Sequence, residues 1–198
     1  MILRRIFLVK SSTAFTAPKF NLRCIAGSSG RLDVICRCIL NAFFIDESNF
    51  RRNVVFYGVL EGPPDPPKTL CIDGFEVEHM VLDEVWIANM ILDLFSGKIF
   101  KGFKISKMSF RSVVEFLRSS GVNVVYMHED GIPIENYSFK SDFDYCFIIG
   151  DQIGLDHHSE KFLDSIGVIR ISLGRIPYLS SQCIWLINAF LDGLNLNG

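Results

Sequence analysis

The chain has 198 residues, a mass of 22.5 kDa and 49% hydrophobic residues, which fits one domain (1–198) with a substantial core. Its formal net charge of −2 excludes a strongly basic nucleic-acid-binding protein, although clustered Lys and Arg would still give a local basic face. No apolar run reaches the roughly eighteen residues that a membrane span requires, so we expect a cytoplasmic protein with no membrane partner.

Residues 1–10 predict a first strand. Two arginines interrupt the apolar run and no cleavage site follows it, which argues against a signal peptide. Residues 18–30 then predict a turn-rich loop whose end, at Ser29 or Gly30, caps a helix. Apolar residues recur with a helical period over 31–44, which indicates a helix with one buried face.

The six cysteines lack the spacing of a disulfide framework, and a chain of this length needs no covalent cross-links, so we expect reduced thiols. Cys36 and Cys38 have a C-x-C spacing. Residues two apart point to different sides of a helix, however, and no second Cys/His pair lies nearby. We therefore expect no metal site, and we interpret His157-His158 as a solvated pair in a loop.

A second strand is predicted over 53–60. Four prolines within 61–67 prevent regular structure and indicate a stiff loop. Two short strands, 68–72 and 75–79, are predicted to follow as a hairpin, because the turn dipeptide Asp-Gly lies between them.

The next helix is predicted to begin at Asp83-Glu84, with apolar residues at helical spacing up to residue 95. Residues 96–108 interleave lysines with phenylalanines. Such a segment either binds RNA by charge and stacking or forms a surface loop with a short strand, and we favour the loop. Ser109 is predicted to cap a further helix over 110–119.

The last third of the chain contains three predicted buried strands, 122–126, 145–149 and 168–172, with a turn at 129–131 after the first. Apolar runs of this kind are typical of parallel strands covered on both faces by helices, so the predicted fold class is α/β. Open α/β sheets bind ligands at the carboxyl ends of their strands. Gly150 and Gly154 permit a sharp turn there, although an ordinary strand-to-loop turn would carry the same glycines.

Four segments in one order match a known family. They are Gly30-Arg-Leu-Asp33 followed by Cys36-Arg-Cys38, Arg51-Arg-Asn-Val-Val-Phe-Tyr57, Phe147-Ile-Ile-Gly-Asp-Gln-Ile-Gly154, and Arg170-Ile-Ser-Leu173 with Cys183. In these motifs the chain resembles the archaeal tRNA (pseudouridine-N1)-methyltransferases of the SPOUT superfamily. The resemblance covers nearly the whole chain.

The resemblance implies a mostly parallel sheet flanked by helices, with a deep C-terminal trefoil knot of the kind that proteins rarely form. It implies S-adenosylmethionine as cosubstrate and tRNA as partner, with methylation of N1 of the pseudouridine at nucleotide 54 in the T-loop. It also implies a homodimer, for which the mean hydropathy of +0.29 is a weak additional argument. Residues 1–120 would then form an RNA-facing half and residues 121–198 a knotted cofactor-binding half.

By match to the family, the cofactor site lies at strand ends and loops of the last third. It consists of Met127, Gly150, Leu173, Gly174, Arg175, Ile176, Pro177, Tyr178 and Cys183. Main-chain groups can bind an adenine edge without special side chains. Cys183 is expected to pack on the cofactor, because direct methyl transfer needs no covalent intermediate. Where the family has a His-Ala-Asn-His type run before this cysteine, the chain has Leu179-Ser-Ser-Gln182, so no role of those histidines transfers.

Asp33 and Arg31 are the predicted catalytic residues. In the first turn of a helix, Asp33 is most simply a partner of the helix dipole, but related rRNA pseudouridine-N1 methyltransferases carry a similar Arg-x-Asp at this place. N1–H of pseudouridine is a weak acid, so methylation at N1 requires proton removal or polarisation of the base. A carboxylate that accepts N1–H, with an arginine at O2 or O4, would provide both.

Arg51 and Arg52 are the predicted RNA-binding residues. Basic residues crowd positions 1–52, where acids are few, which favours a basic face on this half. An ordinary solvated charge distribution fits the sequence equally well.

Two alternative functions stay open. In the first, the chain is a SPOUT methyltransferase that acts on another nucleotide, either an rRNA pseudouridine or a ribose 2′-OH. In the second, it is a catalytically silent RNA-binding dimer that keeps the knot as a scaffold. Binding of S-adenosylmethionine separates an enzyme from a scaffold.

Overall fold

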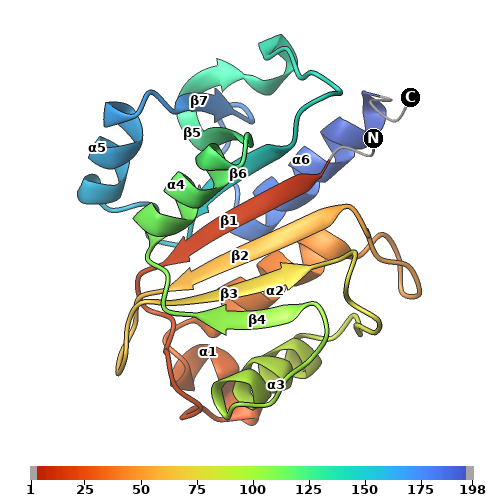
Figure 1. Cartoon of the computed structure of the whole chain (residues 1–198), viewed down its shortest axis with the longest axis vertical. Coiled ribbons are helices and arrows are strands. Elements are labelled where there is room, and N and C mark those ends of the chain that lie inside the picture. The colour runs from red at the N-terminus through yellow and green to blue at the C-terminus, as the bar shows by residue number, and fades with distance from the viewer. Residues whose placement is uncertain (1–3, 195–198) are drawn as a thin grey trace.

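A seven-stranded sheet organises the computed structural model, which describes residues 4–194 (Figure 1). The strand order is β4-β3-β2-β1-β6-β5-β7, and β1 lies at the centre with parallel partners on both sides. Within residues 4–194, β3 runs opposite to the other six strands, since it pairs antiparallel with β2 and β4. The strands are β1 (Arg5–Ser11), β2 (Val54–Leu60), β3 (Lys68–Asp73), β4 (Phe103–Ser106), β5 (Asn123–Pro133), β6 (Tyr145–Gly150) and β7 (Ile169–Ser172).

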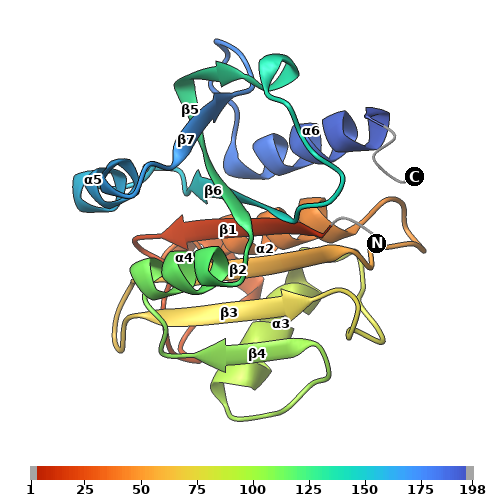
Figure 2. The same cartoon turned by 45° about the horizontal axis from the view of Figure 1, so that its top comes forward.

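Helices cover both faces of the sheet (Figures 1 and 2). One face packs against α2 (Leu32–Phe43), α3 (Glu84–Phe95) and α6 (Ser180–Gly193), and the other against α4 (Phe110–Ser119) and α5 (His157–Ser165). Side chains of β1 alternate between these two cores, because successive residues of a strand point to opposite faces. The α/β fold with a mostly parallel sheet is therefore confirmed.

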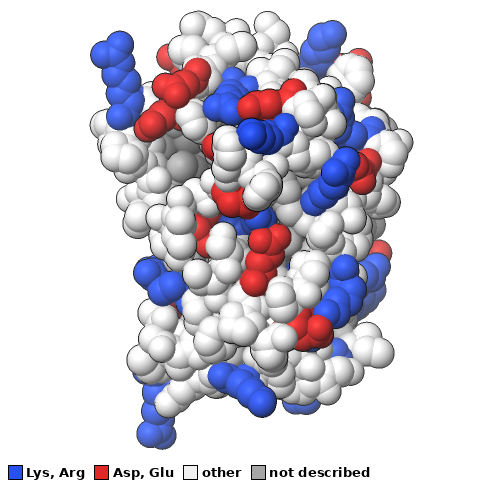
Figure 3. Space-filling view, turned by 90° about the vertical axis from the view of Figure 1, so that its left-hand side faces the viewer, with Lys and Arg blue, Asp and Glu red and all other residues white. Residues whose placement is uncertain are grey.

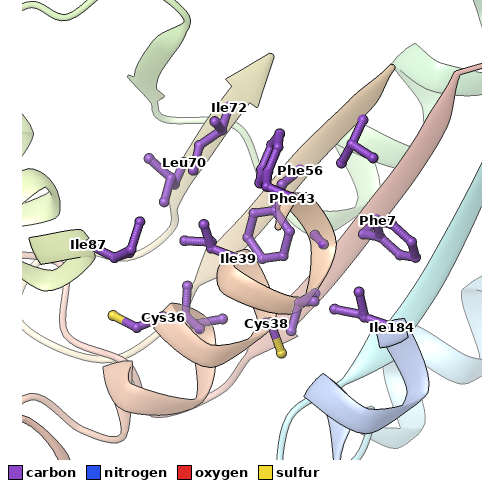
Figure 4. Packing of buried hydrophobic residues seen from close by; sticks show 14 of the residues in the cluster. Phe7, Cys36, Cys38, Ile39, Phe43, Phe56, Leu70, Ile72, Ile87 and Ile184 are labelled. Atoms are coloured by element: carbon purple, nitrogen blue, oxygen red, sulfur yellow. The ribbon is translucent and has the colours of Figure 1, made fainter. Parts of the chain in front are cut away.

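Helix α2 is the central helix of the larger core (Figure 4). Ile39 and Phe43 point towards strands β2 and β3, while Cys36 and Cys38 point away from each other, towards α3 and α6. Burial raises the pKa of both thiols, so both are neutral side chains of the core. Among residues 4–194, no three His, Cys, Asp or Glu side chains come together as metal ligands would.

The predicted hairpin of 68–72 with 75–79 is wrong. The free edge of β3 pairs with β4 instead, and the amide of Asp73 donates to the carbonyl of Gly102 at 2.9 Å. Residues 75–79 form a turn and an irregular segment that carries Val77 into the core, because an apolar residue gains more by burial than by pairing at a solvated edge. The preferred interpretation of 96–108, a surface loop with a short strand, is confirmed by β4.

Three further boundaries differ from the sequence prediction. The turn expected at 129–131 is a bulge within β5, where the pairing with β7 shifts between Met127 and Ile132. His157-His158 begins α5 rather than lying in a loop, since Asp156 caps this helix by accepting from the amides of His158 and Ser159. The loop predicted over 18–30 contains two short helical segments, Leu22–Cys24 and α1 (Ile25–Ser28).

Within the described part of the chain, no helix combines the length and the apolar character that crossing a bilayer requires.

Candidate active site

A cavity of about 390 Å³ lies at the carboxyl ends of β6 and β7, beside the bulge of β5. Its walls come from β5 where its bulge begins, the loop after β6, the loop after β7 and the first turn of α6. All the cofactor residues expected from the sequence line it except Arg175: Met127, Gly150, Leu173, Gly174, Ile176, Pro177, Tyr178 and Cys183. A volume of this size and a mixed apolar and polar lining suit a small organic ligand.

Glycine permits the close approach of two chain segments in this wall. A Cβ on Gly150 would lie 2.5 Å from the main chain of Gly154, so a side chain at position 150 would force the loop open. The carboxylate of Asp151 holds the loop by accepting from the amides of Ser12 and Ile153, both at 2.9 Å. The hydroxyl of Ser180 donates to the carbonyl of Gly150 at 2.7 Å, which ties the start of α6 to the same loop.

Cys183 lies in the wall of the cavity, in the first turn of α6. Burial raises the pKa of this thiol to about 11, so it is protonated at neutral pH and a poor nucleophile. Its Sγ lies 3.9 Å from the carbonyl oxygen of Tyr178. The position and the raised pKa suit a packing role.

Asp33 anchors two arginines at the start of α2. Nε and Nη2 of Arg31 donate to the two carboxylate oxygens at 3.0 and 3.1 Å, and Arg37, one turn along the helix, donates to Oδ2. The Asp33 side chain is 4% exposed, whereas both arginine side chains are 44% exposed. Hydrogen bonding to Asp33 raises the pKa of Arg31, so the guanidinium stays charged.

The local chain geometry presents these arginines to solvent. Arg31 adopts a left-handed conformation with φ 71° immediately before α2. The N-cap residue of α2 is thus Arg31, not Ser29 or Gly30 as expected, although the hydroxyl of Ser29 accepts from the amide of Leu32 at 3.0 Å.

A second cavity, of about 320 Å³, lies next to the first and is lined by Arg31 and Arg37. The two cavities share four wall residues: Asp151, Pro177, Tyr178 and Ser180. The predicted catalytic segment therefore faces a space that adjoins the predicted cofactor site, although Asp33 itself does not line that space.

Arg51 and Arg52 lie at the opposite, amino end of the sheet, before β2. Arg51 forms a bidentate ion pair with Asp192 of α6, at 3.1 and 2.7 Å. Arg52 donates to the carbonyl of Val77, and its guanidinium lies 4.2 Å from the ring centroid of Phe50. Their RNA-binding role stays a prediction, and these intramolecular contacts give it no support.

The carboxyl ends of the central strands lie on the face shown in Figure 3, where acidic and basic side chains are interspersed. Lys10, at the end of β1, pairs with Glu61 and Asp156 and is 6% exposed in its side chain. The basic residues of 1–52 are divided between the two ends of the sheet, with Lys10, Arg31 and Arg37 at the carboxyl end and Arg51 and Arg52 at the amino end. Arg31 and Arg37 are the pair that combines exposure with a position beside the cavities.

Sequence reasoning missed Arg37, Tyr126, His128 and Glu160 as site residues. The i, i+4 spacing of Asp33 and Arg37 on a predicted helix was a readable signal. Tyr126 and Glu160 are 34 positions apart in sequence and meet only because α5 packs beside β5. No local pattern could have found that pair.

A cavity at the carboxyl edge of a parallel sheet is typical of an α/β enzyme with a small-molecule site, and two anchored guanidiniums beside it suit anionic groups. The family model "Putative SAM-dependent RNA methyltransferase" matches residues 4–196. The chain belongs to the tRNA (pseudouridine-N1)-methyltransferase family of S-adenosylmethionine-dependent RNA methyltransferases. The resemblance seen in the sequence motifs is thereby confirmed.

Two relatives illustrate the match. The tRNA (pseudouridine(54)-N(1))-methyltransferase of Methanococcus maripaludis strain C5 is 39% identical over 195 residues, which cover 95% of this chain and 98% of the relative. The enzyme of the same name from Pyrococcus abyssi is 35% identical over 206 residues, which cover 97% and 99%.

Among solved structures, Archaeoglobus fulgidus Nep1 bound to S-adenosylhomocysteine has a TM-score of 0.61 to this chain, with 15% identity and 96% of each chain covered. At this identity the likeness concerns the fold, and it confirms the predicted SPOUT-type α/β architecture.

Proposed function

We propose that this protein transfers a methyl group from S-adenosylmethionine to N1 of pseudouridine 54 in tRNA. The names of its relatives support this reaction. The observation that carries it is the adjacency of two cavities, one with the cofactor residues expected from the sequence and one with Arg31 and Arg37. A transfer between two bound molecules requires that their sites meet.

The cofactor cavity has features that fit an adenosyl group. Apolar side chains such as Ile149, Leu155 and Ile171 line it, and Gly174, at φ 108°, contributes main chain without a side chain. When bound, S-adenosylmethionine supplies a methyl group on a positively charged sulfur. The residues of this cavity therefore have only to bind and orient it, with the methyl group towards the shared wall.

In the second cavity, we assign Arg31 and Arg37 to the RNA. A guanidinium can donate to a phosphate or to a base carbonyl such as O2 or O4 while other N–H groups remain on Asp33. Asp33, which is buried, then holds the two exposed arginines in place. Asp33 is buried and does not line this cavity, so for it to accept N1–H directly, the role expected from the sequence, the arginines that cover it must move.

We also propose a homodimer. Ile176, Leu179 and Trp185, at 64%, 63% and 58% exposure, lie on the loop before α6 and on α6 itself. Large apolar side chains gathered in one segment are typical of a surface that another subunit covers. Sedimentation equilibrium tests this, and a monomer at micromolar concentration contradicts it.

The C-terminal segment is proposed to form the family's trefoil knot, and its hydrogen bond from Ser180 to Gly150 supports a close passage of the two loops. In functional terms, we propose an RNA-facing half (1–120) and a cofactor-binding half (121–198) that share one sheet across β1. Because tRNA is the proposed substrate, the proposed location is the cytoplasm.

The test uses two tRNA transcripts that differ only in carrying uridine or pseudouridine at position 54. After incubation with the protein and S-adenosylmethionine, we expect N1-methylpseudouridine in the pseudouridine transcript alone, detected by nucleoside mass spectrometry. Methylation of a ribose, or of rRNA instead of tRNA, would contradict the proposed substrate. Binding of tRNA without binding of S-adenosylmethionine would indicate the silent RNA-binding dimer.

A further inference from the structure

Besides the exposed Glu129, three polar side chains that lie together line the cofactor cavity away from the wall that it shares with the second cavity. They are Tyr126 and His128, where the bulge of β5 begins, and Glu160 on α5, and none of them lines the arginine cavity. The hydroxyl of Tyr126 donates to Oε1 of Glu160 at 2.9 Å. His128 lies beside them, with its Nε2 3.9 Å from the same oxygen and its ring centroid 5.4 Å from that of Tyr126.

Tyr126 fixes the direction of the Glu160 carboxylate. Burial, together with the hydrogen bond to Glu160, raises the pKa of Tyr126, so its hydroxyl keeps the proton that it donates. The guanidinium of Arg170 lies 5.7 Å from the Tyr126 ring centroid, but it donates to both carboxylate oxygens of Asp164 at 3.0 Å. Arg170 therefore gives Glu160 no direct hydrogen bond.

The second carboxylate oxygen of Glu160 has capacity to accept. Within residues 4–194, every contact found for this carboxylate is made through Oε1. The side chain is 27% exposed and lines the cavity. A half-buried carboxylate with an open acceptor gains most from a ligand that brings a hydrogen-bond donor.

The surroundings favour a sugar hydroxyl as that donor. Ile149 and Ile171, which directly follow the register partners of Tyr126 on β6 and β7, line the same cavity and give it an apolar wall. An apolar wall suits a nucleobase, and ribose is the polar group joined directly to the base. Carboxylates that accept from ribose hydroxyls are a recurrent device of nucleotide-binding α/β folds.

We infer that Glu160 binds the ribose of S-adenosylmethionine by accepting a hydrogen bond from a ribose hydroxyl at Oε2, with Tyr126 as the residue that positions it. This inference rests on the proposed function, because it names a contact within the same cofactor site. It adds a charged side chain to a site that the sequence presents as built from main-chain groups.

The test is calorimetry with two ligands, S-adenosylmethionine and 5′-methylthioadenosine, which keeps the ribose but has no amino-acid part. We expect Glu160→Gln to weaken both ligands by a similar factor of about tenfold. Tyr126→Phe should weaken both by a smaller factor, because the carboxylate remains but is less well fixed. Glu135→Gln removes the same charge from an exposed position outside the cavity, and should change neither affinity.

A loss for S-adenosylmethionine without a loss for 5′-methylthioadenosine would overturn the inference, since Glu160 would then contact the amino-acid part. Unchanged affinity for both ligands would overturn it as well. If the wild-type protein binds neither ligand, the proposed function fails first. That result is distinct, because it appears before any variant is compared.

Discussion

At each end of the sheet, two arginines share one aspartate, but the two clusters differ in which partner is exposed. At the amino end, Arg5 and Arg51 both pair with Asp192, and their side chains are 4% and 15% exposed. At the carboxyl end, Arg31 and Arg37 both pair with Asp33, and each is 44% exposed. In the first pair the aspartate is the more exposed partner, and in the second the arginines are.

Which partner is exposed decides whether a cluster can bind a ligand. The terminal N–H groups of the buried guanidiniums donate to the protein: Arg5 also donates to the side chain and the carbonyl of Asn188, so the amino-end cluster links α6 to β1 and to the start of β2. Exposed guanidiniums on a buried carboxylate keep donors for a ligand. A count of basic residues along the sequence treats the two pairs alike, whereas exposure separates them.

The largest effect is expected for Asp33→Ala. Both arginines lose the acceptor that fixes them, so kcat/KM for tRNA should fall about 100-fold while the cofactor affinity stays nearly unchanged. Methyl-transfer kinetics and calorimetry with S-adenosylmethionine measure the two quantities, with Glu47→Ala, an exposed acid of the same half, as control. Loss of cofactor binding would show that Asp33 belongs to the cofactor site. The carboxyl-end cluster would then not be an RNA-binding counterpart of the amino-end cluster.

The amino-end pair is tested by Arg51→Ala. Removal of the bidentate partner of Asp192 should lower the free energy of unfolding by about 2 kcal/mol, a value reduced because Asp192 is 42% exposed. For a chain of this length we expect Tm to fall by about 4–8 °C. A raised KM for tRNA at unchanged Tm would instead establish Arg51 as an RNA-binding residue.

Arg31→Ala is the matched variant at the carboxyl end. We expect KM for tRNA to rise about tenfold, the loss of one charge-assisted contact, while Tm changes little because the guanidinium is exposed. Raising the salt concentration should weaken wild type more than the variant, since the variant makes one contact fewer with the phosphates. If tRNA binding by wild type and by the variant depended equally on salt, Arg31 would contact a base instead of a phosphate.

The smallest effect is expected for the ion pair of Lys10 with Asp156, at the carboxyl end of the sheet. Both side chains already have other partners in the protein. Burial opposes the charge of Asp156, but hydrogen bonds from Lys10 and Ser159 outweigh it and hold its pKa below the usual value. Burial likewise opposes the charge of Lys10, but its bonds to Asp156 and Glu61 outweigh this and raise its pKa. Both groups therefore stabilise the fold between the ordinary pKa values, about 4 and about 10.

Asp156→Asn should accordingly destabilise the protein near neutral pH by about 1 kcal/mol, since the carboxylate is 40% exposed and Lys10 keeps Glu61. The difference from wild type should shrink as the pH falls below about 4, where the unfolded chain takes up a proton that the folded carboxylate resists. Urea unfolding at several pH values measures this. A difference that persists at low pH would show that the effect comes from the lost helix cap.

Much of the fold follows from local patterns. Buried runs such as 145–149 predict central strands, Ser109 caps the helix expected after it, and glycines at 150 and 154 mark the turn in the cavity wall. These features depend on the spacing of apolar residues and on the conformational freedom of glycine, and both can be read directly from a sequence. The residues of the cofactor loops, by contrast, were named from the match to the family and not from any local pattern.

The tertiary structure alone decided which partners meet. It paired β3 with β4 instead of with 75–79, it buried Asp33 beneath two arginines, and it brought Glu160 against Tyr126. Each outcome depends on side chains far apart in sequence that compete for one edge, one carboxylate or one cavity wall. The sequence determined where the chain turns and which faces are apolar, but exposure and long-range pairing, which separate an anchoring charge from a binding one, exist only in the packed molecule.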